Sequence, residues 1–338
     1  MNYLQWLSGH TDSVWWHDSA NMSEAERALA WGAQGMTTNP FLVNQTLRSP
    51  KEEWDLSTKG LSGDQKALHA IKTVTTTYAQ KFQPIRDVGQ EGRGYVCAQT
   101  NPNKCGDYHY MVKQAKVLSS WAPNIVVKLP ATRAGIRAYE ECVAAGINVA
   151  ATVSFTVSQV LAVGEAAKRG KERAKAAGIT PPLTIAVLMV GRLDDYLRDV
   201  AQDRDLAIGE DDIRQAGTAC IKHAYTLFQE RGYDTFLMPA GCRGAYHISA
   251  LSGAKMIMSI SPKIQDELVS LDEQQFVTRI DEPVDPATLE RLLTLDEFAR
   301  AYRADGMQAE EFITFGSTNR TIDQFINSGW NPLTALER

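Results

Sequence analysis

One lysine in this sequence stands where its amine could act as a nucleophile. Lys128 interrupts the run Ile-Val-Val-Lys-Leu-Pro at positions 125–130, which holds no other polar side chain. A lysine is rarely buried without a partner, and apolar surroundings favour its neutral amine, which can attack a carbonyl and form an imine. The alternative is an outward-pointing lysine whose stem lies along an apolar surface while its charge reaches water.

Further polar residues end other segments that are otherwise largely apolar. If those segments are parallel strands of a barrel, their carboxyl ends meet at one face, where barrel enzymes hold their active sites. An aspartate there can move protons, and arginines there can bind a phosphate through paired guanidinium donors. The candidates of this kind are Asp18, Asn39, Gln99, Thr152, Arg192 and Arg243.

Three of these candidates also have simpler explanations. Asp18 precedes Ser-Ala-Asn and could cap a helix. A buried Thr152 could bond only to its own backbone. Arg192 could form a surface ion pair, because Asp194 and Asp195 follow it closely. The arrangement of the segments in space decides between these roles.

Eight short apolar or β-branched runs alternate along the chain with amphipathic segments. Strands that alternate with helices predict βαβ units and a parallel sheet, and a count of eight favours a closed barrel over an open sheet. We therefore expect an α/β fold of the (β/α)8 TIM-barrel class. The expected strands cover residues 14–18, 35–38, 95–99, 125–129, 148–153, 184–190, 235–239 and 256–260.

Helices are expected between these strands. Ser23, before two nearby glutamates, is the expected N-cap of one helix, and Gly146 is expected just past the end of another. Residues 48–63 are expected to form an insertion over one mouth of the barrel, and residues 82–94 to be irregular. The expected helices cover residues 23–31, 64–81, 107–121, 134–145, 157–177, 210–231 and 245–253.

The chain continues well beyond the eighth expected strand. Helical segments over residues 287–304 and 321–328 have too few strong apolar runs to form a core of their own. We therefore expect a catalytic barrel over residues 1–262 and a C-terminal helical extension, residues 263–338, which packs on the barrel.

Composition argues against several other classes of protein. The 338 residues are 44% hydrophobic and carry a net charge of −5, without the basic cluster that nucleic-acid binding requires. No apolar run approaches the ~18 residues that span a bilayer, and no signal peptide is expected. Five scattered cysteines without a CxxC pair predict reduced thiols in the cytoplasm, and six histidines without ligand spacing predict no metal site.

Six segments, in order and at the expected strand ends, resemble those of transaldolases. Thr-Thr-Asn-Pro at 37–40 is similar to the signature that follows their second strand, and residues 127–136 resemble their Schiff-base lysine segment. The resemblance extends over about residues 14–262, and more loosely through the tail. The other similar segments are residues 145–159, 190–194, 240–243 and 261–262.

The resemblance implies a role for each matching residue. Lys128 would form the imine with a ketose carbonyl, and Asp18 would shuttle protons while a carbon–carbon bond breaks and re-forms. Thr152 and Gln99 would hold a catalytic water near the imine, and no cofactor or metal is implied. The residues that would contact the substrate are Asn39, Thr38, Arg192, Arg243, Ser154 and Met189.

Five positions depart from the transaldolase pattern. Gln99 replaces a glutamate, and the fructose-6-phosphate aldolase branch of the superfamily carries a glutamine there. Met189 replaces the phenylalanine of transaldolases and the tyrosine of the aldolase branch. Gly241 and Val187 replace serines, and Ala150 replaces an asparagine. The Schiff-base centre therefore matches, whereas the residues that recognise the substrate are altered.

Three functions are compatible with these residues. The first is a transaldolase-type transferase that moves a dihydroxyacetone unit between sugar phosphates in pentose-phosphate-type carbohydrate metabolism. The second, which Gln99 favours, is an aldolase that releases the free ketone. The third is a barrel that binds sugars or a partner protein without catalysis, and the intact lysine, aspartate and threonine set argues against it. A homodimer is the expected assembly, from base rates and from family habit.

Overall fold

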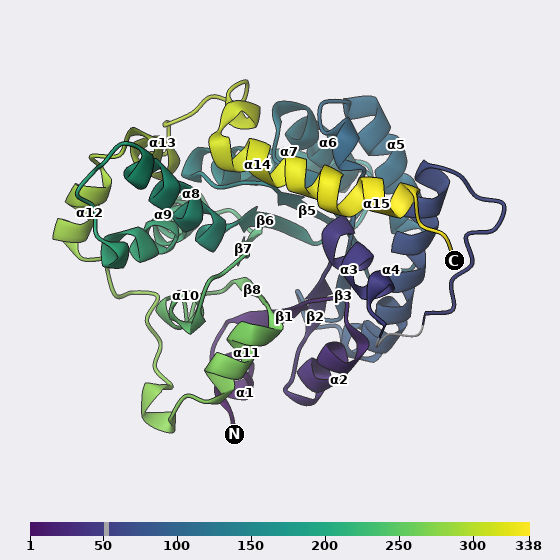
Figure 1. Ribbon diagram of the computed structural model, residues 1–338, viewed down its shortest axis with the longest axis horizontal. Coiled ribbons are helices and arrows are strands. Elements are labelled where there is room, and N and C mark those ends of the chain that lie inside the picture. The colour runs from purple at the N-terminus through teal and green to yellow at the C-terminus, as the bar shows by residue number, and fades with distance from the viewer. Residues whose placement is uncertain (51–53) are drawn as a thin grey trace.

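The molecule is a parallel eight-stranded barrel surrounded by helices (Figure 1). The computed structural model describes residues 1–50 and 54–338. The strands pair in the order β7-β6-β5-β4-β3-β2-β1-β8, and β7 and β8, at the two ends of this order, contact each other. This nearly closed barrel confirms the expected TIM-barrel class. The strands are β1 (Val14–Asp18), β2 (Gly35–Thr37), β3 (Tyr95–Gln99), β4 (Ile125–Pro130), β5 (Val149–Thr152), β6 (Thr184–Leu188), β7 (Phe236–Pro239) and β8 (Ile257–Ile260).

Parallel pairing brings the functional strand ends to one edge of the barrel. Lys128 of β4 stands opposite Gln99 of β3 and Ala150 of β5, and Pro130 stands opposite Thr152. All residues of β3, β4 and β5 are buried, as expected for strands that are covered by helices on one face and by the barrel interior on the other.

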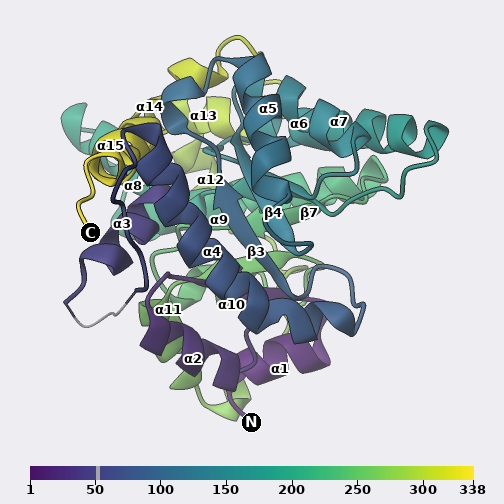
Figure 2. The same ribbon diagram turned by 90° about the vertical axis from the view of Figure 1, so that its right-hand side faces the viewer.

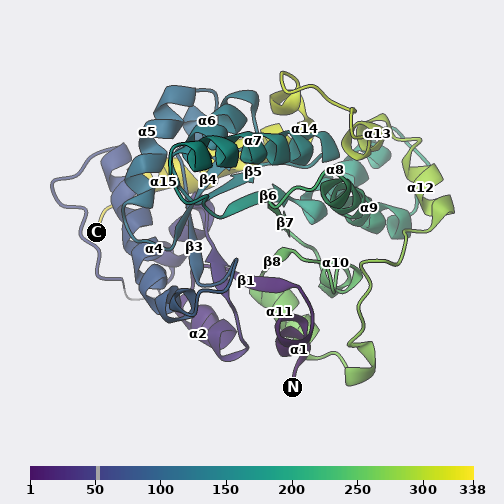
Figure 3. The same ribbon diagram turned by 180° about the vertical axis from the view of Figure 1, so that it is seen from behind.

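Helices cover the outside of these strands, and Figure 3 shows them from behind. Most of the expected helices are confirmed to within two residues at each end, and Gly146 (φ 77°) follows the end of α6 as expected. The helices are α1 (Tyr3–His10), α2 (Met22–Ala30), α3 (Pro40–Arg48), α4 (Asp64–Asp87), α5 (Tyr108–Ser119), α6 (Arg133–Ala144), α7 (Val157–Ala176), α8 (Val190–Asp203), α9 (Glu210–Glu230), α10 (Ala245–Ala250) and α11 (Pro262–Val269).

Two predictions about helix ends are wrong. Asn21, not Ser23, caps α2, because the Asn21 side chain accepts the backbone N–H of Glu24 at 3.1 Å. α4 runs on through Pro84 to Asp87, so the first part of the segment expected to be irregular is helical. Phe82, which is fully buried, extends the apolar face of α4, and this packing outweighs the hydrogen bond that the proline removes.

The strand expected over residues 184–190 ends earlier, at Leu188, and α8 begins at Val190. Arg192 therefore lies in the first turn of a helix rather than at the end of a strand. Gly191 allows this helix to approach the loop after β7, since a Cβ at this position would lie 2.5 Å from the carbonyl oxygen of Gly241.

The C-terminal extension crosses the mouth of the barrel. Its last helices form one long rod in Figure 1, and Figure 2 views this rod from its end, close to α3. The single helix expected over 287–304 is two helices, because the Thr294 hydroxyl bonds to the carbonyl of Arg291 and ends the first one. The elements are η2 (Glu273–Gln275), α12 (Pro286–Leu292), α13 (Asp296–Tyr302), η3 (Phe312–Thr314), α14 (Gly316–Phe325), a π-helix (Ile326–Trp330) and α15 (Asn331–Thr334).

The helix expected over 321–328 begins five residues earlier and passes into the π-helix at Ile326. Gly329 packs directly on α3, where a Cβ would lie 2.7 Å from the backbone nitrogen of Phe41. The insertion expected over 48–63 lies partly outside the described residues. In the part that is described, Thr58 donates its N–H to the carbonyl of Arg338 at 2.8 Å, which ties the insertion to the C-terminal tail.

No helix in the described part of the chain is both long enough and apolar enough to cross a membrane. The five cysteines are free thiols, and four of them are buried.

Candidate active site

A cavity of about 150 Å³ opens at the carboxyl ends of the barrel strands. Side chains from several strand ends and from the first turn of α8 line it, and Phe325 at the end of α14 lines it as well. The C-terminal extension therefore closes part of the site. Seven of the residues expected at the site line this cavity: Asp18, Asn39, Lys128, Thr152, Met189, Arg192 and Arg243.

Lys128 points into the barrel rather than out of it. The residue is 7% exposed and lies in a strand whose other residues are all buried. Its amine lies 3.5 Å from the backbone carbonyl oxygen of Thr38, which is a long hydrogen bond. Over residues 1–50 and 54–338, none of the ion pairs includes this amine. The lysine is thus a lone buried amine that faces a cavity.

Asp18 lines the same cavity as Lys128 and is held by a short chain of hydroxyl groups. The Thr37 hydroxyl donates to a carboxylate oxygen of Asp18 at 2.8 Å, and it lies 2.7 Å from the Ser259 hydroxyl. Since Thr37 donates to Asp18, Ser259 donates to Thr37. Asp18 is partly exposed and does not cap α2, because Asn21 takes that role.

Thr152 and Gln99 flank the lysine strand on either side. Both side chains are buried, and in the described part of the chain neither the Thr152 hydroxyl nor the Gln99 carbonyl oxygen has a hydrogen-bond partner. The hydroxyl of Thr152 is therefore not satisfied by its own backbone. Unpaired buried polar groups at an enzyme site commonly serve a ligand or an ordered water.

The loop after β5 holds Thr152 next to a strained residue. Val153 has a φ of 58°, in the left-handed region that β-branched residues rarely adopt. Gln159 supports this loop: its side-chain oxygen accepts the N–H of Phe155 at 2.9 Å, and its amide nitrogen donates to the carbonyl of Ala131 at 3.2 Å. Backbone strain of this kind concentrates at functional sites, where the surroundings enforce it.

Two arginines stand at the outer edge of the cavity. Arg192 donates to the side-chain oxygen of Gln324 at 2.6 Å, and Arg243 forms an ion pair with Asp195 at 2.6 Å. Burial, and then the positive charge of Arg243, lowers the pKa of the Arg192 guanidinium. The positive charges of the two guanidinium groups repel each other, and an anion bound between them would relieve this repulsion.

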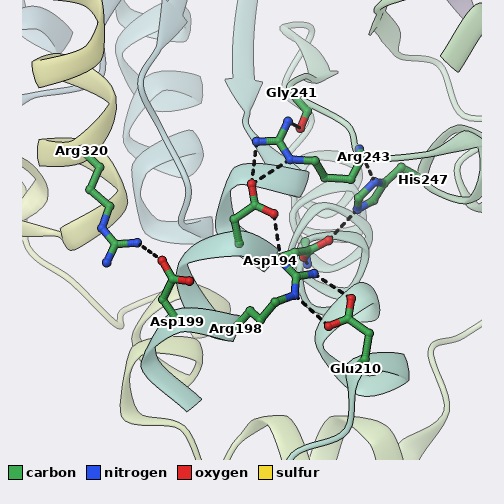
Figure 4. A network of polar contacts seen from close by, with 10 residues as sticks. Asp194, Arg198, Asp199, Glu210, Gly241, Arg243, His247 and Arg320 are labelled. Carbon is green, nitrogen blue, oxygen red and sulfur yellow. Dashed lines mark hydrogen bonds and ion pairs between the residues drawn. The ribbon is translucent and has the colours of Figure 1, made fainter. Parts of the chain in front are cut away.

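A buried histidine–aspartate pair holds the backbone of Arg243 in place (Figure 4). His247 and Asp194 are both fully buried, and Nε2 of His247 lies 2.9 Å from a carboxylate oxygen of Asp194. Nδ1 of His247 accepts the backbone N–H of Arg243 at 3.2 Å, so the ring proton is on Nε2 and is donated to Asp194. Asp194 also accepts the backbone N–H of Gly217 in α9 at 2.8 Å. The pair therefore fixes the loop after β7 to α8 and α9.

Three of the expected residues lie near the cavity without lining it. The Thr38 hydroxyl donates to the carbonyl of Cys97 at 2.7 Å, and the Ser154 hydroxyl donates to the carbonyl of Val187. Gln99 is buried and stands opposite Lys128 in the sheet.

Sequence reasoning missed other residues that line the cavity. Thr37 lies within the Thr-Thr-Asn-Pro signature and is the hydroxyl partner of Asp18, which the signature could have indicated. No sequence motif marks Phe325, because its place depends on how the extension folds over the barrel. The missed residues include Thr37, Phe41, Leu42, Met238, Cys242, Ser259, Ser261 and Phe325.

The cavity also contains a thiol that is unsuited to nucleophilic chemistry. Burial, followed by the negative charge of Asp18, raises the pKa of Cys242 to about 12. Burial likewise raises the pKa of Cys97, behind the lysine strand, to about 12. Thiols of this kind stay protonated at neutral pH, and the thiolate is the nucleophile. Lys128 is therefore the stronger candidate for covalent chemistry in this cavity.

Comparison with known proteins agrees with this arrangement. A family model described as transaldolase/fructose-6-phosphate aldolase matches residues 15–314. Transaldolase 1 from Streptomyces avermitilis is 30% identical over 299 residues, which cover 79% of this chain and 75% of that protein. The transaldolase of Thiobacillus denitrificans is 27% identical over 344 residues, covering 89% of this chain and 91% of that protein. The chain therefore belongs to the transaldolase/fructose-6-phosphate aldolase family and is an enzyme with a transaldolase-type function.

Proposed function

We propose that this enzyme is a transaldolase that moves a dihydroxyacetone unit from a ketose phosphate to an aldose phosphate. The observation that carries the proposal is the buried Lys128, set in an apolar strand and facing a cavity that also holds Asp18 and Thr152. The neutral amine of a lysine is the form that attacks a carbonyl and becomes an imine.

The first half of the reaction breaks a carbon–carbon bond. The neutral amine of Lys128 adds to the ketone carbonyl, one water leaves, and the resulting imine takes up one proton from the solvent. Asp18 takes the proton from the hydroxyl group on the carbon that will leave as the aldehyde. The carbon–carbon bond then breaks, and the electrons of that bond pass to the protonated imine. An aldehyde leaves, and the dihydroxyacetone unit stays on the lysine as an enamine. Asn39, which lines the cavity, would hydrogen-bond the substrate hydroxyls.

The second half reverses these steps with a different aldehyde. The enamine carbon attacks the carbonyl of the acceptor, and Asp18 returns its proton to the new hydroxyl group. Water then adds to the imine, and the ketose product leaves as the amine is restored. The unpaired oxygens of Thr152 and Gln99 are two of the polar partners that a bound water needs.

The substrates proposed for this enzyme are sugar phosphates. Arg192 and Arg243, at the edge of the cavity, are the groups that would bind phosphate, because guanidinium forks suit phosphate oxygens. We expect the enzyme to act in the cytoplasm, where its free cysteines would stay reduced, and to form a homodimer.

Gln99 favours a second candidate, an aldolase that releases free dihydroxyacetone. A neutral amide can position a water but cannot take its proton, so hydrolysis of the imine would rely on other groups. Met189 lines the cavity in place of either aromatic residue of the family and offers no phenol for such a role.

Product analysis with and without an acceptor separates the two candidates. With fructose 6-phosphate as donor, a transaldolase forms the new ketose phosphate only when an aldose phosphate is present, and it releases little free dihydroxyacetone. Dihydroxyacetone released equally fast without acceptor would reject the transferase and support the aldolase. The Lys128→Met variant should form neither product.

A further inference from the structure

Phe325 of the C-terminal extension forms part of the wall of the catalytic cavity. The extension carries it across the mouth of the barrel (Figure 1), and its side chain is 1% exposed. A phenylalanine ring has no polar group to offer a sugar hydroxyl, so its contribution is to shape the cavity and to keep water out of it. The other large apolar side chains of the lining come from α3, from the residue after β6 and from β7: Phe41, Leu42, Met189 and Met238.

Contacts on both sides of Phe325 hold it in this place. Gln324, the residue before it, accepts a hydrogen bond from the guanidinium of Arg192 at 2.6 Å. That guanidinium also lies 5.7 Å from the centre of the Phe325 ring. On the other side, Trp330 is fully buried and donates its ring N–H to Asp64 of α4 at 2.8 Å. The ring therefore keeps a fixed position relative to the barrel.

The π-helix that follows Phe325, Ile326–Trp330, connects these contacts. The backbone N–H of Asn331 donates to the carbonyl of Ile326, five residues earlier. Such a turn holds one residue more than an α-helical turn, and turns of this kind are frequent at functional sites. Within it, Gly329 packs so closely on α3 that a Cβ would lie 2.7 Å from a backbone nitrogen of that helix. The chain can thus touch α3 at Gly329 while Phe325 faces the cavity.

Water decides between two fates of the enamine on Lys128. In transfer, the enamine carbon attacks the aldehyde of the acceptor and forms a new carbon–carbon bond. In hydrolysis, the same carbon takes up one proton from the solvent, and water adds to the resulting imine. The carbon–nitrogen bond then breaks, which releases dihydroxyacetone, the lysine amine and one proton. Both fates start from the same intermediate, so their ratio depends on how freely water reaches it.

We propose that Phe325 determines the reaction specificity of this enzyme. Its ring limits the access of bulk water to the enamine on Lys128 and so favours transfer over hydrolysis. The proposal rests on the proposed transaldolase function, because it concerns the intermediate of that reaction. It is compatible with a bound water at the unpaired oxygens of Thr152 and Gln99, since the ring acts on exchange with the solvent.

Phe325→Ala tests the proposal through the ratio of two rates. With fructose 6-phosphate alone, the release of dihydroxyacetone should be about tenfold faster than in wild type, while transfer to an aldose phosphate should be slower. A loss of packing alone would lower both rates together and leave their ratio unchanged. Phe325→Leu keeps a smaller apolar side chain and should lie between wild type and Phe325→Ala. An unchanged ratio in both variants would overturn the proposal.

The lifetime of the covalent intermediate is a second readout. Each enzyme is loaded with fructose 6-phosphate, separated from free sugars by rapid gel filtration and treated with borohydride after increasing delays, and the adduct is measured by intact mass. The adduct should disappear about tenfold faster from Phe325→Ala than from wild type. Phe315→Ala removes another buried phenylalanine of the extension, one outside the lining of the cavity, and should keep the wild-type lifetime and ratio.

The same experiment separates this inference from the proposed function. Wild type without any adduct would reject the proposed function and this inference together. An adduct on wild type that lasts equally long on Phe325→Ala would reject this inference alone and leave the Schiff-base mechanism in place.

Discussion

Lys128 and Thr152 carry polar groups that the fold buries with few hydrogen-bond partners. Lys128 is 7% exposed, and its amine has only a long contact with the carbonyl of Thr38. The Thr152 hydroxyl has no partner in the described part of the molecule. Such arrangements lower stability, and enzymes keep them where a substrate or a water completes the bonding. Asp18 differs because Thr37 supports it with a hydrogen bond at 2.8 Å.

Thr152→Val separates the catalytic role of this hydroxyl from its structural role. Valine has nearly the same shape, so we expect the free energy of unfolding in urea to stay the same or to rise by up to about 1 kcal/mol. If the hydroxyl holds the hydrolytic water, kcat should fall about 10²-fold. Thr218→Val, which also removes an unpaired buried hydroxyl, is the matched control on α9 and should keep full activity. A kcat within twofold of wild type for Thr152→Val would contradict the assigned role.

Sequence patterns identified single residues only where an apolar run made a polar side chain conspicuous. Lys128 stands out in this way, and the structure places it in the cavity. Ser154 does not stand out in the sequence. It follows Val153, whose positive φ turns the chain at a point that no sequence pattern marks. The Ser154 hydroxyl consequently bonds to the carbonyl of Val187. The direction of such a side chain depends on backbone angles, which composition does not reveal.

Three elements bring Arg192, Arg243 and Arg320 to one cleft, and each element is fixed by contacts outside the barrel strands. The first turn of α8 carries Arg192, the loop after β7 carries Arg243, and α14 carries Arg320. The loop is held by the buried pair of His247 and Asp194. Sequence analysis did not predict the start of α8, because the run Val-Leu-Met-Val at 187–190 carries the apolar pattern of β6 into the first residue of the helix.

Replacing His247 tests whether this pair holds the loop. His247→Leu leaves Asp194 buried with only the N–H of Gly217 as a partner, so we expect a loss of about 3–5 kcal/mol in the free energy of unfolding. The KM for fructose 6-phosphate should also rise, because the backbone of Arg243 loses its acceptor. Urea denaturation and steady-state kinetics measure the two effects.

The matching control removes both partners. Asp194→Leu combined with His247→Leu takes away the unpaired charge and should recover most of the lost stability, although not the low KM. His10→Leu, at an exposed position, should change neither quantity. Equal stability of His247→Leu and wild type would show that the pair is not structural.

At the scale of the whole molecule, the sequence predicted the barrel class. It did not predict that the C-terminal extension lies across the mouth of the barrel. Eight separate apolar runs are a strong signal, since each strand is local and buried on both faces. The path of the extension depends on distant contacts, such as that of Gly329 with Phe41 and that of Thr58 with Arg338. Those contacts form between segments that lie far apart in the chain, and no local pattern encodes them.

The stability of the whole fold should depend on pH through His17, which lies on the outer face of the barrel. Burial lowers the pKa of His17 from 6.5 to about 4, although the hydrogen bond with Gln265 acts in the opposite direction. Between these two values the unfolded chain takes up a proton that the folded protein excludes. Stability is therefore full above about pH 6.5 and falls as the pH drops towards 4, by about 3 kcal/mol in total.

Urea denaturation across this range checks the effect. His17→Gln keeps an acceptor for Gln265 but does not titrate, so its stability should vary less between about pH 4.5 and 6.5 than that of wild type. Parallel pH profiles for the two proteins would assign the dependence to other groups.

Trapping the imine tests the central claim most directly. Wild-type enzyme would be treated with borohydride in the presence of fructose 6-phosphate, and its intact mass compared with that of Lys128→Met under the same conditions. We predict a mass increase that corresponds to one reduced sugar-derived adduct on wild type, mapped to Lys128 by peptide analysis and absent from the variant. Wild type without an adduct, or an adduct of equal yield on Lys128→Met, would contradict a Schiff base on this lysine.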